Sequence, residues 1–370
     1  MSKLEELIKE LCPNGVEYKT LEEVLKYEQP TKYIVTNTKY NDSYSTPVLT
    51  AGQTFILGYT NETSGVYNAS MYNPVIIFDD FTTANKWVDF NFKVKSSAMK
   101  LLTSVDDKQY NLRYLYHLIQ TIKYEAVDHS RQWIAKYSQF KVPVPPMEVQ
   151  NEIVRILDNF TELTAELTAE LTARKKQYEY YSESLFKPRK NWKIKNLEEI
   201  ADIGTGNSNT NEGLEIGEYP FFVRSQEVRR KNTYEFDETA IITSGDGVGV
   251  GKIFHYIEGK YALHQRAYRI HITDSEILPK YFFYYMRATF YNYIQKASFH
   301  SSVTSIRRPM LNNYTVPIPS PKEQERIVSI LDRFDKLCND ISVGLPAEIE
   351  ARKKQYEYYR DKLLTFKEVS

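Results

Sequence analysis

The chain contains two copies of one long sequence motif, and this internal repeat limits its architecture more than any other feature. Each copy opens with alternating prolines, continues with Gln-x-x-Ile-Val-x-Ile-Leu-Asp-x-Phe and closes with Ala-Arg-Lys-Lys-Gln-Tyr-Glu-Tyr-Tyr. The first prolines, Pro143 and Pro317, are 174 residues apart, and the closing arginines, Arg174 and Arg352, are 178 residues apart. Chance similarity does not produce an agreement of this length, so the chain is predicted to consist of two related halves.

Both copies are predicted to form long helices, because apolar residues recur three or four positions apart after the prolines. Between Thr161 and Thr172 the first copy is a near-perfect Thr-Ala-Glu-Leu repeat, whose period of four drifts by about 40° per unit around a 3.6-residue helix. The second copy has Gly344-Leu345-Pro346 at the equivalent place. An interior proline removes a hydrogen bond, so we expect that helix to be kinked or divided. The residues predicted to form the helix seam and to dock a partner are Ile153, Ile156, Leu157, Phe160, Leu163, Leu167, Leu171, Tyr178, Ile327, Ile330, Leu331, Phe334, Leu337 and Tyr356.

The stretches before the two helices also match, although more weakly, and they predict two related globular domains. The matching pairs are Ile76-Ile77 with Ile241-Ile242, which are strand-like, residues 98–102 with 267–271, and residues 112–119 with 279–286, which are helical. The predicted fold class is α+β, with two globular α/β domains separated by two long antiparallel helices that form a coiled-coil spacer with pseudo-two-fold symmetry. The predicted segments are an N-terminal segment near the helices at 1–19, the first domain at 20–145, the first helix at 146–186, a linker at 187–195, the second domain at 196–318 and the second helix at 319–370.

The repeat has two interpretations. One is simple gene duplication that enlarged a stable fold. The two helices, however, are nearly identical while the globular parts have diverged. This difference is expected when the helices hold a common partner and the globular parts recognise different targets. A chain of this plan is suited to touching two separated sites.

Composition excludes several classes of protein. Lys plus Arg and Asp plus Glu both total 48, so binding to a polyanion must use a local patch rather than a polybasic tail. Cys12 and Cys338 lie far apart, which argues against a disulfide scaffold or a structural zinc site. The first six residues are too charged for a signal peptide, and no 18-residue apolar run is present. We therefore expect a cytoplasmic protein without a membrane partner.

The sequence offers no credible catalytic set. Residues 245–251 are rich in glycine, but the residues that follow alternate like a strand and no Gly-Lys-Ser/Thr occurs, so a nucleotide-binding loop is not predicted. Asp79-Asp80 beside Lys86 lack the acid–lysine pair of a nuclease and are interpreted as a solvated turn. The six histidines show no metal-ligand spacing. No bound metal, no cofactor and no enzymatic activity are therefore predicted for this chain.

Charge is distributed unevenly in the second half of the chain. Residues 201–250 hold nine acidic and four basic side chains, whereas residues 251–310 hold nine basic and three acidic ones. The basic stretch mixes cations with aromatic and hydroxyl side chains, which suits duplex DNA because cations neutralise phosphates and polar side chains read base edges. A solvated basic face is the alternative for each residue. The predicted DNA contacts are Lys86, Lys93, Lys95, Arg131, Gln132, Lys136, His264, Gln265, Arg266, Arg269, Ser301, Ser302, Ser305, Arg307 and Arg308.

These repeated motifs resemble a known family, the specificity (S) subunits of type I restriction-modification systems. The resemblance rests on the proline entry, the Gln-x-x-Ile motif, the Thr-Ala-Glu-Leu tetrads and the closing Ala-Arg-Lys-Lys motif, and it covers nearly the whole chain. It implies a non-catalytic subunit whose two target recognition domains each read one half of a bipartite, asymmetric DNA sequence. The helices would set the spacer between the half-sites and dock two methyltransferase (M) subunits.

The resemblance assigns the chemistry to other chains. S-adenosylmethionine is expected on the M subunits, and ATP and magnesium are expected on two restriction (R) subunits of the full complex. One tetrad lengthens a helix by about 6 Å, against about 3.4 Å per base pair along one DNA strand, so one tetrad would change the half-site separation by one or two base pairs. The segment Leu4 to Leu11 is expected to pack beside the end of the second helix.

Two other functions stay open at this stage. Related systems, in which methyltransferase and nuclease are fused, use the same architecture, and the neighbouring gene would distinguish them. A coiled-coil scaffold that binds protein and no nucleic acid is the second alternative. The basic stretch at residues 251–310 argues against this scaffold.

Overall fold

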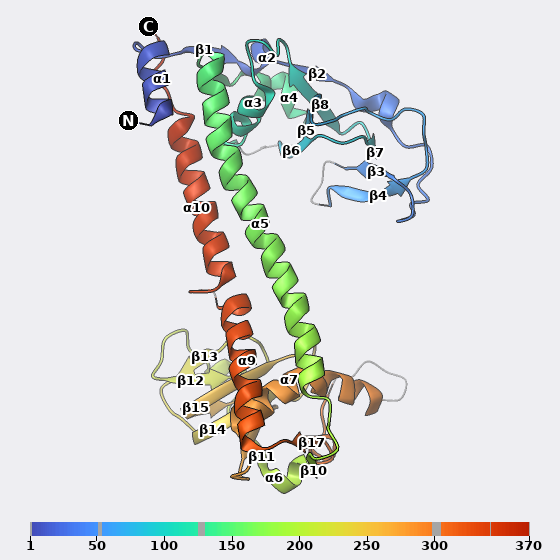
Figure 1. Ribbon diagram of the computed structural model, residues 1–370, viewed down its shortest axis with the longest axis vertical. Coiled ribbons are helices and arrows are strands. Elements are labelled where there is room, and N and C mark those ends of the chain that lie inside the picture. Colours follow the sequence, from blue (N-terminus) through green and yellow to red (C-terminus); the bar gives the residue numbers. More distant parts are fainter. Residues whose placement is uncertain (1, 51–53, 125–129, 298–304, 341, 370) are drawn as a thin grey trace. The chain divides into compact units, whose positions relative to one another are not determined.

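The computed structural model describes residues 2–50, 54–124, 130–297, 305–340 and 342–369, and it divides into two compact units (Figure 1). Unit 1 contains Met1–Glu166 and Glu350–Ser370, and unit 2 contains Leu167–Ile349. Each unit combines sheets with helices, which confirms the predicted α+β class. The division falls inside the first long helix, so each unit includes one part of that helix.

Unit 1 is built around a central strand, β5 (Val75–Asp79), whose residues are all buried. A continuous apolar run of this kind is typical of a strand that is covered on both faces. The strands form a four-stranded sheet in the order β2-β8-β5-β6, a three-stranded sheet β4-β3-β7 and an antiparallel pair β1-β9. The other elements before the long helices are α1 (Lys3–Leu11), β1 (Glu17–Thr20), α2 (Leu21–Val24), β2 (Leu25–Glu28), the short 3-10 helix η1 (Pro30–Tyr33), β3 (Thr46–Leu49), β4 (Ile56–Thr60), β6 (Asn85–Val88), β7 (Lys93–Val94), β8 (Met99–Ser104), α3 (Leu112–Ile119), α4 (Gln132–Ala135), η2 (Tyr137–Gln139) and β9 (Lys141–Val144).

Unit 2 has a six-stranded sheet in the order β11-β16-β14-β15-β12-β13 and an antiparallel pair β10-β17. The longest helix of its globular part, α7 (Pro279–Ala297), packs Tyr281, Phe282 and Met286 into the main core of the unit. The remaining elements are β10 (Lys193–Asn196), α6 (Leu197–Ile200), β11 (Ala201–Thr205), η3 (Thr210–Glu212), β12 (Tyr219–Phe222), β13 (Arg229–Lys231), β14 (Phe236–Ser244), β15 (Phe254–Leu263), β16 (Ala267–Ile272), α8 (Arg308–Asn312) and β17 (Thr315–Ile318).

The two units share one strand arrangement, β2-β8-β5-β6 in unit 1 and β11-β16-β14-β15 in unit 2. Ile76 lies opposite Leu102, and the matching Ile241 lies opposite Ile270. The sequence match of residues 98–102 with 267–271 paired Leu101 with Ile270, so it is wrong by one position. A shift of one residue turns a side chain to the other face of a sheet, and burial therefore decides the register.

Each globular part begins and ends in a two-stranded sheet. Thr20 pairs with Lys141 in unit 1, and Asn196 pairs with Thr315 in unit 2. A one-turn helix follows the first strand in both units, and each starts with a capping box that uses Glu23 or Glu199. The predicted domain boundaries, between residues 19 and 20 and between residues 195 and 196, fall inside β1 and β10. Each of these strands enters a globular part and pairs with the strand that leaves it.

The first repeated motif forms one helix, α5 (Met147–Leu185), whereas the second forms two, α9 (Pro321–Asn339) and α10 (Leu345–Leu363). The predicted division of the second helix is therefore confirmed. A Cβ at Gly344 would lie 2.5 Å from the carbonyl oxygen of Lys336 and 2.8 Å from that of Asp340. Only glycine fits this approach without a shift, and Pro346 falls in the first turn of α10, where its missing N–H has no helical acceptor.

The two repeats pair reciprocally and antiparallel within the units. In unit 1, the ring of Phe160 on α5 stacks on Tyr359 of α10, with 5.4 Å between the ring centroids. In unit 2, the ring of Phe334 on α9 lies beside that of Tyr181 on α5, the residue equivalent to Tyr359, with 5.9 Å between the ring centroids. Thus the entry motif of each repeat packs against the closing motif of the other.

The predicted seam residues differ in burial. Ile153, Leu157, Ile327 and Leu331 are fully buried. Partly buried side chains form the next group, whereas Leu163 and Leu337 are 45% and 36% exposed. The partly buried group consists of Ile156, Phe160, Leu167, Leu171, Tyr178, Ile330, Phe334 and Tyr356. The seam residues nearest the globular parts are therefore the most deeply buried, and burial decreases along each helix away from them.

The N-terminal segment lies against the end of α10 in unit 1. The backbone N–H of Val16 donates to the carbonyl of Lys367 at 2.8 Å, and the N–H of Val369 donates to the carbonyl of Val16 at 3.0 Å. The hydroxyl of Tyr18 donates to the carbonyl of Phe366 at 2.8 Å. Leu4 of α1 joins the main core of the unit. Residues 4–18 and 363–369 therefore pack against each other within unit 1.

Replacing Gly344 with alanine should destabilise the break between α9 and α10. The added Cβ must push carbonyl oxygens apart, and we expect the free energy of unfolding to fall by about 1–3 kcal/mol. Urea denaturation followed by circular dichroism measures this loss. The neighbouring Val343→Ala, at a side chain that is 68% exposed, is the matched control and should change stability by less than about 0.5 kcal/mol. Equal effects of the two substitutions would contradict this account of the break.

Candidate nucleic-acid interface

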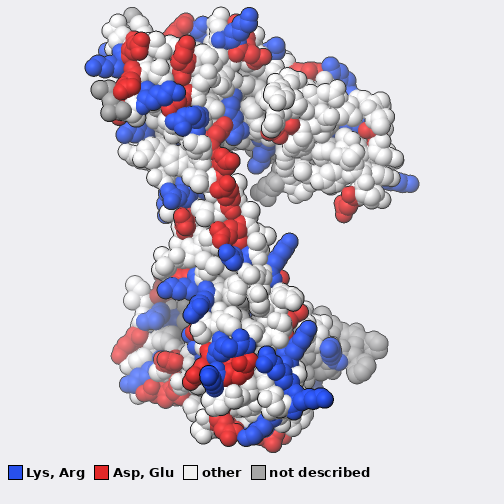
Figure 2. All heavy atoms as spheres, viewed as in Figure 1, with Lys and Arg blue, Asp and Glu red and all other residues white. Residues whose placement is uncertain are grey.

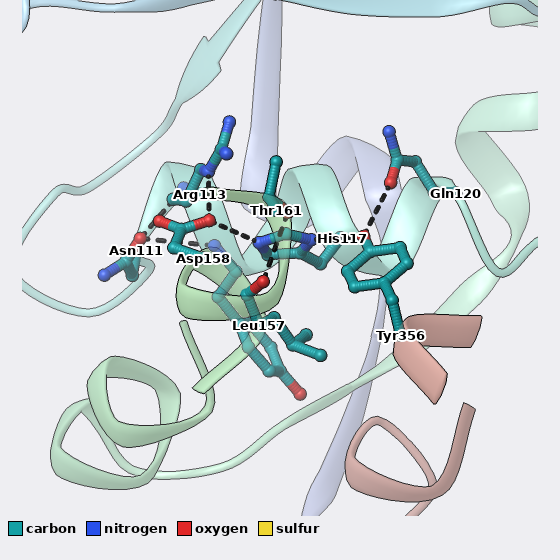
Figure 3. A network of polar contacts seen from close by, with 9 residues as sticks. Asn111, Arg113, His117, Gln120, Leu157, Asp158, Thr161 and Tyr356 are labelled. Atoms are coloured by element: carbon teal, nitrogen blue, oxygen red, sulfur yellow. Dashed lines mark hydrogen bonds and ion pairs between the residues drawn. The ribbon is translucent and has the colours of Figure 1, made fainter. Parts of the chain in front are cut away.

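A polar network joins the globular part of unit 1 to both of its long helices (Figure 3). His117 on α3 is 1% exposed, and its Nε2 lies 3.0 Å from Asp158 Oδ1 on α5. Nε of Arg113 donates to the same oxygen at 2.8 Å. The hydroxyl of Tyr356 on α10 lies 3.1 Å from His117 Nδ1 and 3.2 Å from Gln120 Oε1. Three elements are thereby tied through one histidine.

Burial sets the protonation of this network. It lowers the pKa of His117, and the neighbouring Arg113 adds to this effect, while the Asp158 carboxylate opposes it. Burial raises the pKa of Asp158, but hydrogen bonding to His117 and the charge of Arg113 outweigh burial, so the net shift is downward. A neutral imidazole whose Nε2 carries the proton toward an ionised carboxylate is consistent with both shifts.

Unit 2 has a joint at the equivalent position with different donors. Asp332 of α9, the counterpart of Asp158, accepts from the hydroxyl of Tyr284 at 2.5 Å and pairs with Lys280 at 3.0 Å. One turn further along, Nη1 of Arg287 lies 3.0 Å from Asp335. The carboxylate is repeated, whereas its partners on the globular side are not.

A buried glutamine reinforces each joint. Nε2 of Gln150 donates to the carbonyls of Pro145 and Gln109, and its Oε1 accepts from the backbone N–H of Asn111. Gln324 makes the same three kinds of bond, to Pro319, Glu276 and Leu278. The role of these residues was not predicted, although the repeat preserves all four polar positions, Gln150, Gln324, Asp158 and Asp332. Their identity in both copies of the repeat was the signal that could have found them.

Most of the DNA contacts predicted in the second half come together in unit 2. The loops after β12 and β14 and the turn between β15 and β16 meet at Asp246, which pairs with Arg224 at 2.6 Å and with Arg266 at 3.3 Å. Ser305 forms a backbone bridge with Asp246. His264 lies beneath the turn, and its Nδ1 accepts the backbone N–H of Arg266. Gln265, Arg307 and Arg308 are exposed nearby in the chain.

The charges in this cluster shift its titrating groups. Burial raises the pKa of Asp246, but the guanidinium groups of Arg224 and Arg266 lower it by more than burial raises it. The net shift of this pKa is therefore downward. Burial and the charge of Arg224 lower the pKa of His264. The cluster therefore has an ionised carboxylate, a neutral histidine and several exposed guanidinium groups, and it can bind an anionic ligand.

Some predicted contacts lie elsewhere. Arg269 has a side chain that is 13% exposed and forms ion pairs with Asp202 and Glu238 on the sheet, and its use as a DNA contact stays a prediction. Lys93 is a correction, because its side chain is 3% exposed and forms an internal ion pair with Glu62 at 2.8 Å. Gln132 is fully buried and accepts the hydroxyl of Tyr124. Ser301 and Ser302 lie outside the described residues.

Four of the predicted DNA contacts in unit 1 have exposed side chains, namely Lys86, Lys95, Arg131 and Lys136. Lys86 is on β6, next to the central strand β5. Gln132 donates its backbone N–H to the carbonyl of Asp80, just as Ile306 does to Gly245 in unit 2. Arg131 and Ser305 therefore occupy equivalent positions. Their use as DNA contacts stays a prediction.

Asp79-Asp80 do not form the predicted solvated turn. Asp80 is 1% exposed, its Oδ1 accepts the backbone N–H of Trp133 at 3.0 Å, and Lys100 lies 3.5 Å away. Asp79 accepts the backbone N–H of Phe81 at 2.9 Å. Asp80 therefore holds the end of β5 against α4, whereas Asp79 caps the turn that follows the strand. Packing against a later segment is what the local sequence did not show.

The glycine-rich segment 245–251 leads into strand β15, as predicted, and not into a helix. Gly251 has a φ of +69°, and a Cβ there would lie 2.4 Å from Ile294 Cδ1. The glycine therefore serves a turn packed against α7. Val248 at the tip is 99% exposed, so the loop projects beside the Asp246 cluster.

An acidic row follows the tetrads of α5 (Figure 2). Glu162, Glu166 and Glu170 are spaced one tetrad apart and are all exposed. Carboxylates in such a row repel the phosphates of a DNA backbone. We therefore expect DNA to contact the globular parts and not this face of the helix.

Two further observations apply to the described part of the chain. None of its helices is both long and apolar enough to cross a membrane. Within the same residues, no group of three or more His, Cys, Asp or Glu side chains is arranged to hold a metal ion.

Two similar sheet-rich units on a repeated helical frame define a class of protein that presents two related binding modules. The chain belongs to the type I restriction modification DNA specificity domain family, whose model matches residues 13–174 and 189–351. The two matches correspond to the two halves of the internal repeat.

Curated relatives and solved structures agree with this assignment. The chain is 44% identical over 399 residues to the EcoR124I/EcoR124II specificity subunit of Escherichia coli, covering 99% of this chain and 98% of the relative. It is 30% identical to a putative type I specificity subunit of Haemophilus influenzae, over 85% and 86% of the two chains. An S subunit structure from M. genitalium shares the fold, with a TM-score of 0.65 at 13% identity and coverage of 95% and 96%. The predicted family is confirmed.

The buried His117 should make unit 1 less stable in mild acid. The unfolded histidine gains a proton as the pH falls through its ordinary value of 6.5, whereas the folded one stays neutral to lower pH. Stability is therefore lost as the pH falls below about 6.5. We expect the wild type to lose up to about 1 kcal/mol more than His117→Gln between pH 7.5 and 5.5, measured by chemical denaturation. A larger loss in the variant would contradict this protonation state.

Proposed function

We propose that this chain is a DNA-reading subunit whose two units each contact one half of a bipartite target, while other chains carry out the chemistry. The observation that carries the proposal is the repeat of one globular fold with diverged surface residues, on helices whose entry and closing motifs have diverged little. The exposed guanidinium cluster around Asp246 supports an anionic ligand for unit 2. The match to a DNA specificity domain supports the same conclusion.

The partners follow from the same proposal. Two M subunits would dock on the helices and hold S-adenosylmethionine, and two R subunits would supply ATP- and magnesium-dependent cleavage in the full complex, which we place in the cytoplasm. The specificity subunit of Escherichia coli, at 44% identity, is named as part of a type I restriction enzyme, which supports partners of this kind. The exposed Leu163 and Leu337 offer apolar contacts for such partners. No catalytic role is proposed for this chain.

A methylation map tests the proposal directly. The chain is co-expressed with the M subunit encoded beside it in a methylation-deficient host, and modified bases are mapped across the host DNA. We expect adenine methylation at one bipartite motif that disappears without this chain. Assembly of the complex without any new methylated motif would count against the proposal and favour a protein-binding scaffold.

The tetrads should set the spacing between the two half-sites. Inserting one Thr-Ala-Glu-Leu unit after Leu171 adds about 6 Å of helix, and we expect the spacer in the mapped motif to grow by one or two base pairs while both half-sites stay the same. The same methylation map measures this change. Altered half-sites, or an unchanged spacer with full activity, would contradict a spacer role for α5.

The exposed Arg307 and Arg308 should contact phosphates. Changing both to alanine in the assembled complex is expected to weaken binding to specific and unrelated duplexes alike, and to reduce the slope of log affinity against log salt concentration by about one unit per lost contact. Changing both to lysine retains the charge and is the matched control, which should keep most of the slope. Fluorescence anisotropy at several salt concentrations distinguishes the two. An unchanged slope in the alanine variant would show that these two residues do not contact phosphates.

A further inference from the structure

An acidic side chain lies at the centre of the basic cluster of unit 2. Oδ1 of Asp246 accepts from Nη1 of Arg224 at 2.6 Å, and its Oδ2 accepts from Nη1 of Arg266 at 3.3 Å. Each carboxylate oxygen thus holds a different guanidinium. The Asp246 side chain is 25% exposed, whereas that of Arg266 is 62% exposed, so the acid lies deeper than the arginine that it holds.

Backbone contacts fix this acid in place. The N–H of Gly245 donates to the carbonyl of Arg266 at 2.9 Å, and the N–H of Ile306 donates to the carbonyl of Gly245 at 2.8 Å. The carbonyl of Asp246 itself accepts from Oγ of Ser244 at 2.8 Å. The main chain of Arg266 is further held by Nδ1 of the buried His264 at 2.9 Å. The carboxylate therefore projects from a frame shared by three chain segments.

A carboxylate at this place weakens attraction for phosphate, because it repels the same backbone that the arginines attract. A surface that only neutralised phosphates would be better without it. A guanidinium that reads a base edge has a different requirement, since its plane must be aimed at two acceptors of one base. Holding two long side chains in advance also reduces the entropy lost on binding.

We propose that Asp246 is a positioning residue for sequence discrimination, which holds Arg224 and Arg266 ready to read base edges in the half-site that unit 2 contacts. This inference rests on the proposed DNA-reading function. Asp246 does not itself touch a base. Its carboxylate lowers the affinity for DNA of any sequence, and it fixes the orientation of the two guanidinium groups.

The test compares Asp246→Asn with Asp202→Asn in the complex with M subunits. Asp202 pairs with Arg269 on the sheet, so its replacement removes the same charge and the same kind of ion pair outside the cluster. Three duplexes are used, with the mapped target intact, with one half-site scrambled and with the other half-site scrambled. Affinities are measured by fluorescence anisotropy at one salt concentration.

We expect Asp246→Asn to lower discrimination at one half-site by about ten-fold and to leave the other half-site unaffected. Affinity for an unrelated duplex should stay equal or rise, because a negative charge is lost. Asp202→Asn should keep full discrimination at both half-sites, and Asp246→Glu, which retains a carboxylate, should recover part of the loss. This pattern would support the inference.

Unchanged discrimination in Asp246→Asn would overturn it. An equal loss of binding to all duplexes together with a lower melting temperature would also overturn it, since that result indicates a structural role. The wild-type complex provides the separate check on the proposed function. If the wild type fails to prefer its own mapped target, the DNA-reading function has failed before any variant is compared.

Discussion

The frame of each unit depends on a glutamine that is buried where the globular part meets a long helix. Gln150 and Gln324 each use both amide functions to bind backbone groups from two segments. A buried amide left without these partners would cost about 1–3 kcal/mol for each lost bond, so the proline entry and the loop before the domain helix must keep their positions together. Each glutamine therefore ties the start of its long helix to the globular part of the same unit.

Next to these glutamines, the two units differ in the polar side chains that join the globular part to the long helix. A carboxylate on the long helix is kept in both, but Asp158 faces a neutral histidine and an arginine, whereas Asp332 faces a tyrosine and a lysine. The closing motif of the opposite repeat reaches the unit 1 network through Tyr356. Each repeat therefore completes a packing surface that the other begins, which explains why the helices stayed alike while the domain helices drifted. A change in a helix motif alters two packing surfaces, whereas a change in a domain helix alters one.

The sequence was sufficient for features that repeat or that follow from local rules. The two halves, the α+β class, the division of the second helix at Gly344 and Pro346 and the strand after residues 245–251 were all predictable from pattern. The burial of Lys93 and Gln132 and the low exposure of Arg269 were not, because each is held by a partner from another segment, such as Glu62 or Glu238. Basic residues look alike in sequence whether they face solvent or close an internal ion pair, and the fold alone separates the two cases.

The exposure of a basic residue also decides what its acidic partner does. Arg269 and Arg266 are three residues apart and both are paired with acids, yet the side chain of the first is 13% exposed and that of the second is 62% exposed. An acid that neutralises a buried guanidinium stabilises the sheet, because an unpaired charge there would be costly. An acid that holds an exposed guanidinium contributes little to stability, since solvent screens the pair. Its effect must therefore lie in the direction that the arginine points, and direction is what distinguishes reading a base from neutralising a phosphate.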